Sequence, residues 1–392
     1  MAAGTIHRAT ARTTVILSRT LRGQEFAALI EADQAPVRVQ GRVSGDTLVS
    51  LVMNGTPGVA ADTQRLRIGG PILLPTLVPL AVALEGRPRV GRRYVLPIFD
   101  PATLAPRDVR IEVQAETVFV VNDSSVFDST ARRWHGVLPD TIRAWRVVPE
   151  TGGGGAGGGD GWVDEQGRVV ASTRMGFELR RMPYEVAFEN WRLESVAAPT
   201  APARVAGNRD VFETTAIASN KRLRSTLAEV KVELSGAALA GFDLDGGRQR
   251  FRGDTLTVTR EDSRALAARY FPFQGAQGSR VKELKREPFL EVDHREIVAL
   301  AEKIADGSRN PHVIAQRINQ WVYDSVRKEV TVGIPSALHV LHTRVGDCNE
   351  HTQLYVALAR AAGVPARIAS GLAYVDGKFY YHAWPEVMLR GW

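Results

Sequence analysis

Two side chains of this sequence have the chemistry of a nucleophile and its base. Cys348 is the single cysteine among the 392 residues and lies in the stretch Arg-Val-Gly-Asp-Cys-Asn-Glu-His-Thr, whereas His382 lies in a later run, Tyr-Tyr-His-Ala-Trp-Pro-Glu-Val. The thiolate is the reactive form of cysteine, and an adjacent imidazole is a common acceptor for the thiol proton. The two residues therefore suggest a cysteine–histidine pair, provided that the fold brings them together.

An inert, buried thiol is the alternative interpretation of Cys348. Free cysteine is among the residues most often buried, where it packs as a small apolar side chain. Taken alone, Cys348 fits this interpretation as well as it fits the reactive one. The elements that surround the cysteine and the histidine therefore have to decide between the two.

The residues after Cys348 have the spacing of a helix that begins at Asp347 or at Cys348 itself. Gly363 and the proline that follows, Pro365, are typical of the end of that helix. Unpaired N–H groups and the dipole of a helix N-terminus favour negative charge. We therefore expect this position, together with a neighbouring imidazolium, to lower the pKa of the thiol, and its N–H groups to stabilise an oxyanion.

His382 is expected on the second strand of a hairpin. The runs 366–375 and 378–389 alternate with a two-residue period, and Asp376-Gly377 between them is a turn signal. A side chain on such a strand has a fixed direction, so a neighbouring strand can hold the imidazole against the start of the helix.

Two amphipathic helices are predicted ahead of the cysteine, at 294–310 and 310–330. Asn310 is a good N-cap for the second helix, and Pro311 suits its first position. Residues 290–392 therefore read as helices followed by an antiparallel hairpin, which is an α+β arrangement.

A long ordered pattern in this region resembles the transglutaminase-like superfamily, whose core is of the papain type. The pattern consists of Gly-Asp-Cys at 346–348, Glu350-His351, Arg-Ala-Ala-Gly-Val-Pro-Ala-Arg at 360–367 and His-Ala-Trp-Pro-Glu-Val at 382–387. The resemblance implies a Cys-His-Asp mechanism on a protein or peptide substrate. In it, Cys348 attacks an amide or peptide carbonyl, His382 accepts and returns the proton, and the acyl group passes to an amine or to water.

The sequence departs from this family at the third member of the triad. The family has an aspartate on the strand after the histidine strand, and the sequence ends at Trp392 before that strand. Asp376 and Glu386 are the nearby acids, and neither occupies the matching place. Because an orienting acid fixes the imidazole, the sequence predicts an incomplete core with weak activity or none, from a longer protein. The sequence leaves the compartment open: no signal peptide is visible, and a longer protein of the cell envelope or periplasm is compatible with it.

Other side chains near the cysteine have simpler interpretations. His339, His342 and His351 resemble metal ligands by type, but their spacing to Cys348 matches no compact zinc framework, so no metal or cofactor is predicted. Trp321 lies among apolar residues at helical spacing, which favours core packing over an oxyanion role.

The first two-thirds of the chain are predicted to be mostly β-structure. Short alternating runs and turn signals indicate a curved antiparallel sheet with one helix that begins near Pro79. The glycine-rich stretch 151–161 is read as a hairpin loop. Arg252-Gly253-Asp254 is read as a hairpin turn, not as a cell-adhesion motif. The expected domains are 1–196, β-rich; 207–262, small and β; and 285–392, the transglutaminase-like core.

Composition excludes several classes. The net charge of +7 comes from dispersed arginines, with no single-sign stripe for nucleic acid. The longest apolar run, 69–86, is too short for a membrane span and contains three prolines. The remaining alternative from a different class is a catalytically silent, β-rich binding or scaffold protein with a degenerate core.

Overall fold

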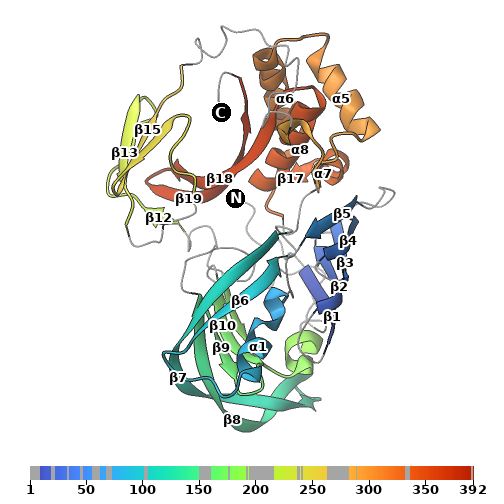
Figure 1. The fold of residues 1–392 in the computed structure, drawn as a ribbon, viewed down its shortest axis with the longest axis vertical. Coiled ribbons are helices and arrows are strands. Elements are labelled where there is room, and N and C mark those ends of the chain that lie inside the picture. The colour runs from blue at the N-terminus through green and yellow to red at the C-terminus, as the bar shows by residue number, and fades with distance from the viewer. Residues whose placement is uncertain are drawn as a thin grey trace.

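The computed structural model of the chain has a β-rich N-terminal part and an α+β C-terminal part (Figure 1). The structure describes residues 9–18, 23–32, 35–44, 47–54, 62–67, 73–100, 105–149, 160–174, 177–190, 193, 216–235, 239, 242–262, 282–287, 289–331, 336–389 and 392. No helix in these ranges is both long and apolar enough to cross a bilayer.

The first sheet is an antiparallel meander of five strands in chain order. The strands are β1 (Ala9–Leu17), β2 (Gly23–Ala32), β3 (Ala35–Ser44), β4 (Thr47–Asn54) and β5 (Asp62–Arg67). Phe26 on β2 is buried, and Gly41 stands opposite it on β3. A Cβ at Gly41 would lie 2.2 Å from the Phe26 ring, so the glycine leaves room for that ring.

The second sheet has six antiparallel strands and carries the larger N-terminal core. The strands are β6 (Arg93–Asp100), β7 (Ala105–Asp128), β8 (Arg133–Pro149), β9 (Asp160–Asp164), β10 (Val169–Arg174) and β11 (Phe177–Arg180). A short helical segment follows them, η2 (Glu185–Glu189). Trp145 is fully buried, and its indole N–H donates to Glu116 at 3.0 Å.

Helix α1 (Val78–Leu84) follows the short turn η1 (Pro75–Leu77) and packs its buried side chains against this second sheet. The predicted helix near Pro79 is therefore confirmed. The N-terminal part differs from the prediction in having two separate sheets, because the chain between β5 and β6 leaves the first sheet through this helical segment. Residues 151–159 of the glycine-rich stretch lie outside the described residues, and the strands beside them, β8 and β9, pair antiparallel.

A small three-stranded sheet follows in the order β13 (Glu229–Glu233), β15 (Thr255–Thr259), β14 (Gln249–Arg252). Gly253 has a φ of 64° in the tight connection between β14 and β15, which confirms that Arg252-Gly253-Asp254 forms a hairpin turn. The boundary expected between the domains 1–196 and 207–262 lies outside the described residues.

The C-terminal part places four helices beside one hairpin (Figure 1). The helices are α5 (Arg295–Ala305), α6 (Pro311–Ser325), α7 (Ala337–Thr343) and α8 (Cys348–Ala361). The hairpin consists of β18 (Ala366–Val375) and β19 (Lys378–Val387), and β12 (Ile217–Ala218) pairs with the start of β19. Two short parallel strands, β16 (Arg327–Lys328) and β17 (Val345–Gly346), lead into α8.

Local signals in the sequence set these elements. Asn310 caps α6 by accepting the N–H groups of His312 and Val313, and Pro311 is the first helical residue, as predicted. Gly363 has a φ of 81° after α8, as expected of a residue just past a helix end. Helix α7 was not predicted, because its seven residues are too few for a helical period to show.

Candidate active site

The start of α8 is fixed by a reciprocal pair of caps. Asp347 accepts the N–H of Asn349 at 2.9 Å, and Glu350 accepts the N–H of Asp347 at 2.9 Å. Glu350 is buried and lies across Gly346, where a Cβ would come within 2.1 Å of the Glu350 side chain. Cys348 is therefore the first residue of a helix whose entry has little freedom.

The thiol of Cys348 is half-buried and lies against β19. The main-chain N–H of Ala383 on β19 donates a hydrogen bond to the sulfur. Ala383 directly follows His382 in the chain. The structure therefore brings the sulfur to the segment of β19 that carries the histidine.

The expected lowering of the thiol pKa is wrong for this structure. Burial raises the pKa of Cys348 above its ordinary value, and the carboxylates of Asp347 and Glu350 raise it further. The N–H groups of Ala383 and of Cys348 itself act in the opposite direction and are outweighed. The main physical reason is therefore burial of the thiol, which the helix-dipole argument did not include. The cap adds to it, because the Asp347 carboxylate brings a negative charge to the helix end, where it accepts the N–H of Asn349.

His382 is exposed on β19, opposite Gly371 of β18. Its ring stacks on Trp384, with 6.3 Å between the ring centroids and 22° between the planes. Within the described part of the chain, the imidazole has no hydrogen-bond partner. His382 therefore has an aromatic neighbour but no orienting acid among these residues.

The two acids near the hairpin are engaged elsewhere. Asp376 lies in the turn, is highly exposed and faces Arg222 at 3.6 Å. Glu386 accepts Arg367 across the hairpin at 2.8 Å. Among the described residues, both carboxylates therefore have an arginine as partner.

The other histidines near Cys348 have separate partners. His342 pairs with Glu296 at 2.8 Å, and the ring nitrogens of His351 lie 2.6 Å from the carbonyl oxygen of Asp347 and 3.2 Å from that of Val326. Burial lowers the pKa of His339. Among the described residues, no cluster of three histidine, cysteine or acidic side chains is placed to hold a metal ion.

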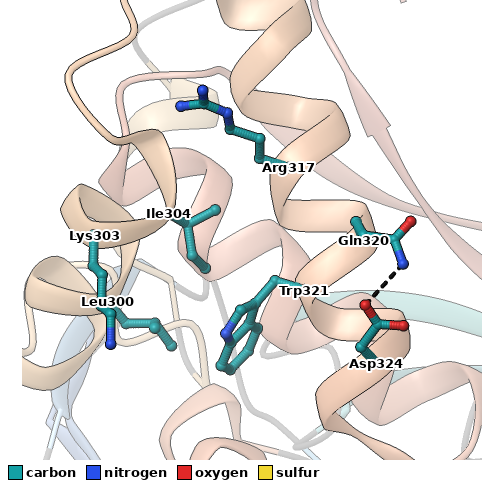
Figure 2. Close-up of a pocket in the computed structure, with 7 residues that line it drawn as sticks. All are labelled: Leu300, Lys303, Ile304, Arg317, Gln320, Trp321 and Asp324. Carbon is teal, nitrogen blue, oxygen red and sulfur yellow. Dashed lines mark hydrogen bonds between the residues drawn. The ribbon is translucent and has the colours of Figure 1, made fainter.

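Trp321 lies in a shallow cavity of about 380 Å³ between α5 and α6 (Figure 2). Its indole packs beside Leu300 and Ile304 on α5, and Arg344 lies 4.3 Å over the ring. These contacts are those of a packing side chain. The residues that line this cavity lie between Leu300 and Asp324, and none of them belongs to the segment around Cys348.

Sequence reasoning missed three residues that shape this site, Ala383, Trp384 and Gly371. The hydrogen bond from Ala383 depends on tertiary packing and has no local signal. Gly371 had one, since a glycine inside a strand often marks a close approach, and a Cβ there would meet the Trp384 ring at 2.9 Å. The Asp347–Glu350 spacing is also readable as a capping box.

Residues 298–392 match the transglutaminase-like superfamily. This C-terminal part of the chain is therefore a transglutaminase-like superfamily core, as the sequence pattern predicted. A search of curated proteins finds no match to the chain.

Three solved structures show distant similarity. A candidate cysteine protease from Cytophaga hutchinsonii is 26% identical over 35% of this chain and 48% of its own, with a TM-score of 0.30. A candidate protease from Parabacteroides distasonis is 17% identical over 38% and 29%, with a TM-score of 0.22. The periplasmic domain of TgpA from Pseudomonas aeruginosa, bound to ethylmercury, is 18% identical over 41% and 66%, with a TM-score of 0.25. The matched region thus spans about half or less of the first two chains.

Proposed function

We propose that the C-terminal core is a thiol enzyme that acts on amide or peptide carbonyls of protein or peptide substrates. Cys348 is the nucleophile, and His382 is its general base. The observation that supports this assignment is the hydrogen bond from the main chain of Ala383 to the thiol, because it joins the start of α8 to the residue beside His382. The domain division at 1–196, 207–262 and 285–392 is part of the proposal, with the N-terminal parts binding or presenting the substrate.

Because the pKa of the Cys348 thiol is raised, the general base His382 is needed to remove its proton. A protonated thiol has to lose its proton as it attacks, so catalysis depends on a correctly placed imidazole. As a new carbon–sulfur bond forms, the thiol proton passes to His382. The carbon–nitrogen bond then breaks, the departing nitrogen takes that proton, and a thioester remains on Cys348.

The thioester is resolved by a second nucleophile. Water or a primary amine attacks the acyl carbon and gives its proton to His382. The carbon–sulfur bond then breaks, and the sulfur takes that proton from His382 to return the thiol. We assign the developing oxyanion to the main-chain N–H of Cys348, since the neighbouring N–H of Asn349 is engaged by Asp347.

A second candidate function is a binding or scaffold protein with a silent core. The raised pKa of the thiol and the absence of an acid at His382 among the described residues favour it. In this case Cys348 is a packed thiol whose reactivity does not depend on His382.

The test uses the full chain with casein as substrate and a fluorescent primary amine as acceptor. Label bound to casein measures transfer, new peptide ends measure hydrolysis, and released ammonia measures deamidation. We expect at least one of these signals in the wild type and none in Cys348→Ala or His382→Asn. Equal signals from the wild type and Cys348→Ala would overturn the enzymatic proposal.

The silent-core alternative has its own readout. Alkylation of Cys348 by iodoacetamide should then follow the pH dependence of an isolated thiol and stay the same in His382→Asn. A lower alkylation rate in His382→Asn near pH 7 would instead support the cysteine–histidine pair.

A further inference from the structure

The imidazole of His382 lies on one face of the β18–β19 hairpin with a set of side chains that touch one another. Residues two apart on a strand share a face, so Trp384 and Glu386 accompany His382. Directly opposite them on β18 stand Gly371, Ala369 and Arg367. The residues on this face of the hairpin are therefore the neighbours of the imidazole on β18 and β19.

Gly371 makes the position of the indole possible. An added Cβ at Gly371 would lie 2.9 Å from Cη2 of Trp384 and 3.5 Å from Cζ3, so the outer edge of the indole reaches across the neighbouring strand at this point. Gly371 is also the residue paired with His382 in the hairpin. Because glycine has no side chain, β18 leaves the space opposite His382 free, and the indole of Trp384 extends into that space. The indole nitrogen is enclosed and has no hydrogen-bond partner among the described residues.

The far end of the same face is held by polar and ring contacts. Arg367 donates to Glu386 at 2.8 Å, and its guanidinium lies 4.4 Å from the centroid of the Trp392 ring. These contacts fix the register of β19 just beyond Trp384. The indole therefore lies over Gly371, and the Arg367–Glu386 pair stands two positions further along the same face.

We propose that Trp384 is a positioning residue that holds the ring of His382 for its role as base. This inference rests on the proposed function of His382. The nearly parallel rings, 6.3 Å apart, have the spacing of an offset stack, in which the neighbour restricts rotation of the imidazole.

An ordinary packing role for Trp384 makes a different prediction. Packing alone would change the stability of the hairpin when the indole is shortened, but it would not link the indole to the reactivity of a sulfur on another element. The experiment therefore measures the pH dependence of Cys348 alkylation together with the free energy of unfolding.

The variants distinguish three effects: loss of the aromatic ring, loss of side-chain volume, and a general change in strand β19. Trp384→Phe retains an aromatic ring, Trp384→Leu retains apolar volume only, and Gly371→Ala pushes the indole from its seat. Phe379→Leu is the matched control, because it removes a ring from the same strand that packs on Tyr374 instead. His382→Asn gives the profile of a thiol without its base.

We expect His382→Asn to slow iodoacetamide alkylation at pH 7 by about tenfold, the effect of one unit in thiol pKa. Trp384→Leu and Gly371→Ala should move the profile toward that of His382→Asn, whereas Trp384→Phe and Phe379→Leu should stay within about twofold of the wild type. The proton signals of the His382 ring should lose their ring-current shift in Trp384→Leu and retain part of it in Trp384→Phe.

The outcomes distinguish the two proposals. A His382→Asn profile identical to that of the wild type overturns the cysteine–histidine pair and the positioning role with it. A clear effect of His382→Asn, combined with a wild-type profile in folded Trp384→Leu and Gly371→Ala, overturns only the positioning role. Urea unfolding of each variant shows that the compared proteins are folded.

Discussion

The six-stranded sheet and the C-terminal core each contain an ionisable side chain, Asp164 and Cys348, and the two have opposite surroundings. In the sheet, Asp164 is 1% exposed, and its carboxylate is satisfied by Arg168 at 2.7 Å, by Arg181 at 3.3 Å and by two main-chain N–H groups. In the core, Cys348 is half-buried beside acids that disfavour its charged form. Saturated pairing stabilises a fold, whereas an incompletely paired group remains available for reaction.

The two regions also differ in how they hold their elements. Helix α8 is buried on almost all sides, from Thr352 to Arg360, so its first residue has a fixed position. The hairpin β7–β8 instead leaves one face open, and Val120 on it is 73% exposed. A helix enclosed on all sides is therefore the element on which a nucleophile can be placed accurately.

The largest predicted effect removes the nucleophile. Cys348→Ala should lower casein turnover by about a thousandfold or more, as loss of a catalytic nucleophile does in other covalent enzymes. It should leave the unfolding free energy within about 0.5 to 1 kcal/mol of the wild type, since one sulfur atom at a half-buried site is lost. The two quantities are measured by initial rates and by urea titration. A matching loss of stability would place Cys348 with the structural groups.

The second prediction concerns packing in the two regions. Leu354→Ala in α8 should cost about 2 to 5 kcal/mol of unfolding free energy, because its fully buried side chain leaves a cavity. Val120→Ala on the open face of β7 should cost no more than about 0.5 kcal/mol. Urea unfolding of both variants tests the contrast, and equal losses would contradict it.

The third prediction concerns Asp164, the buried carboxylate that is paired with two arginines and two main-chain N–H groups. Asp164→Asn should cost about 1 to 3 kcal/mol of stability, because the amide cannot satisfy both Arg168 and Arg181. Casein turnover per folded molecule should stay unchanged. Asp123→Asn is the control, since this exposed carboxylate pairs only at the surface with Arg181. A loss of turnover in folded Asp164→Asn would show that this carboxylate does more than stabilise the sheet.

Local rules predicted the elements of the core better than they predicted the site. Asn310, Pro311 and Gly363 act through their own turn of chain, and each stands where its residue type indicated. The charge state of Cys348 depends on burial and on the Asp347 carboxylate, which helix-dipole reasoning left out. The position of the Trp384 indole depends on Gly371 of the neighbouring strand. It could not be predicted before the pairing register of β18 and β19 was known.

The fourth prediction tests one of these local rules. Asn310→Ala should cost about 1 kcal/mol of unfolding free energy, because the N–H groups of His312 and Val313 lose their cap. Ser308→Ala should cost less, since its hydroxyl accepts a single N–H at 3.3 Å before the helix begins. Thermal or urea unfolding measures both, and a larger loss in Ser308→Ala would contradict the assigned cap.

The last prediction concerns the pH dependence of stability caused by Glu350, a buried acid of the C-terminal core. Burial raises the pKa of Glu350 in the folded chain, and the Asp347 carboxyl raises it further. The folded state therefore binds more protons than the unfolded state between the unfolded pKa of about 4.3 and the folded pKa, so the free energy of unfolding falls as pH rises through this window.

Glu350→Gln should flatten this dependence, because a glutamine oxygen still accepts the N–H of Asp347 and has no proton to lose. Glu329→Gln, at a side chain that is about half exposed, is the control and should leave the slope unchanged. Urea unfolding from pH 4 to 8 measures the slope. An unchanged slope in Glu350→Gln would contradict the raised pKa of Glu350 in the folded chain.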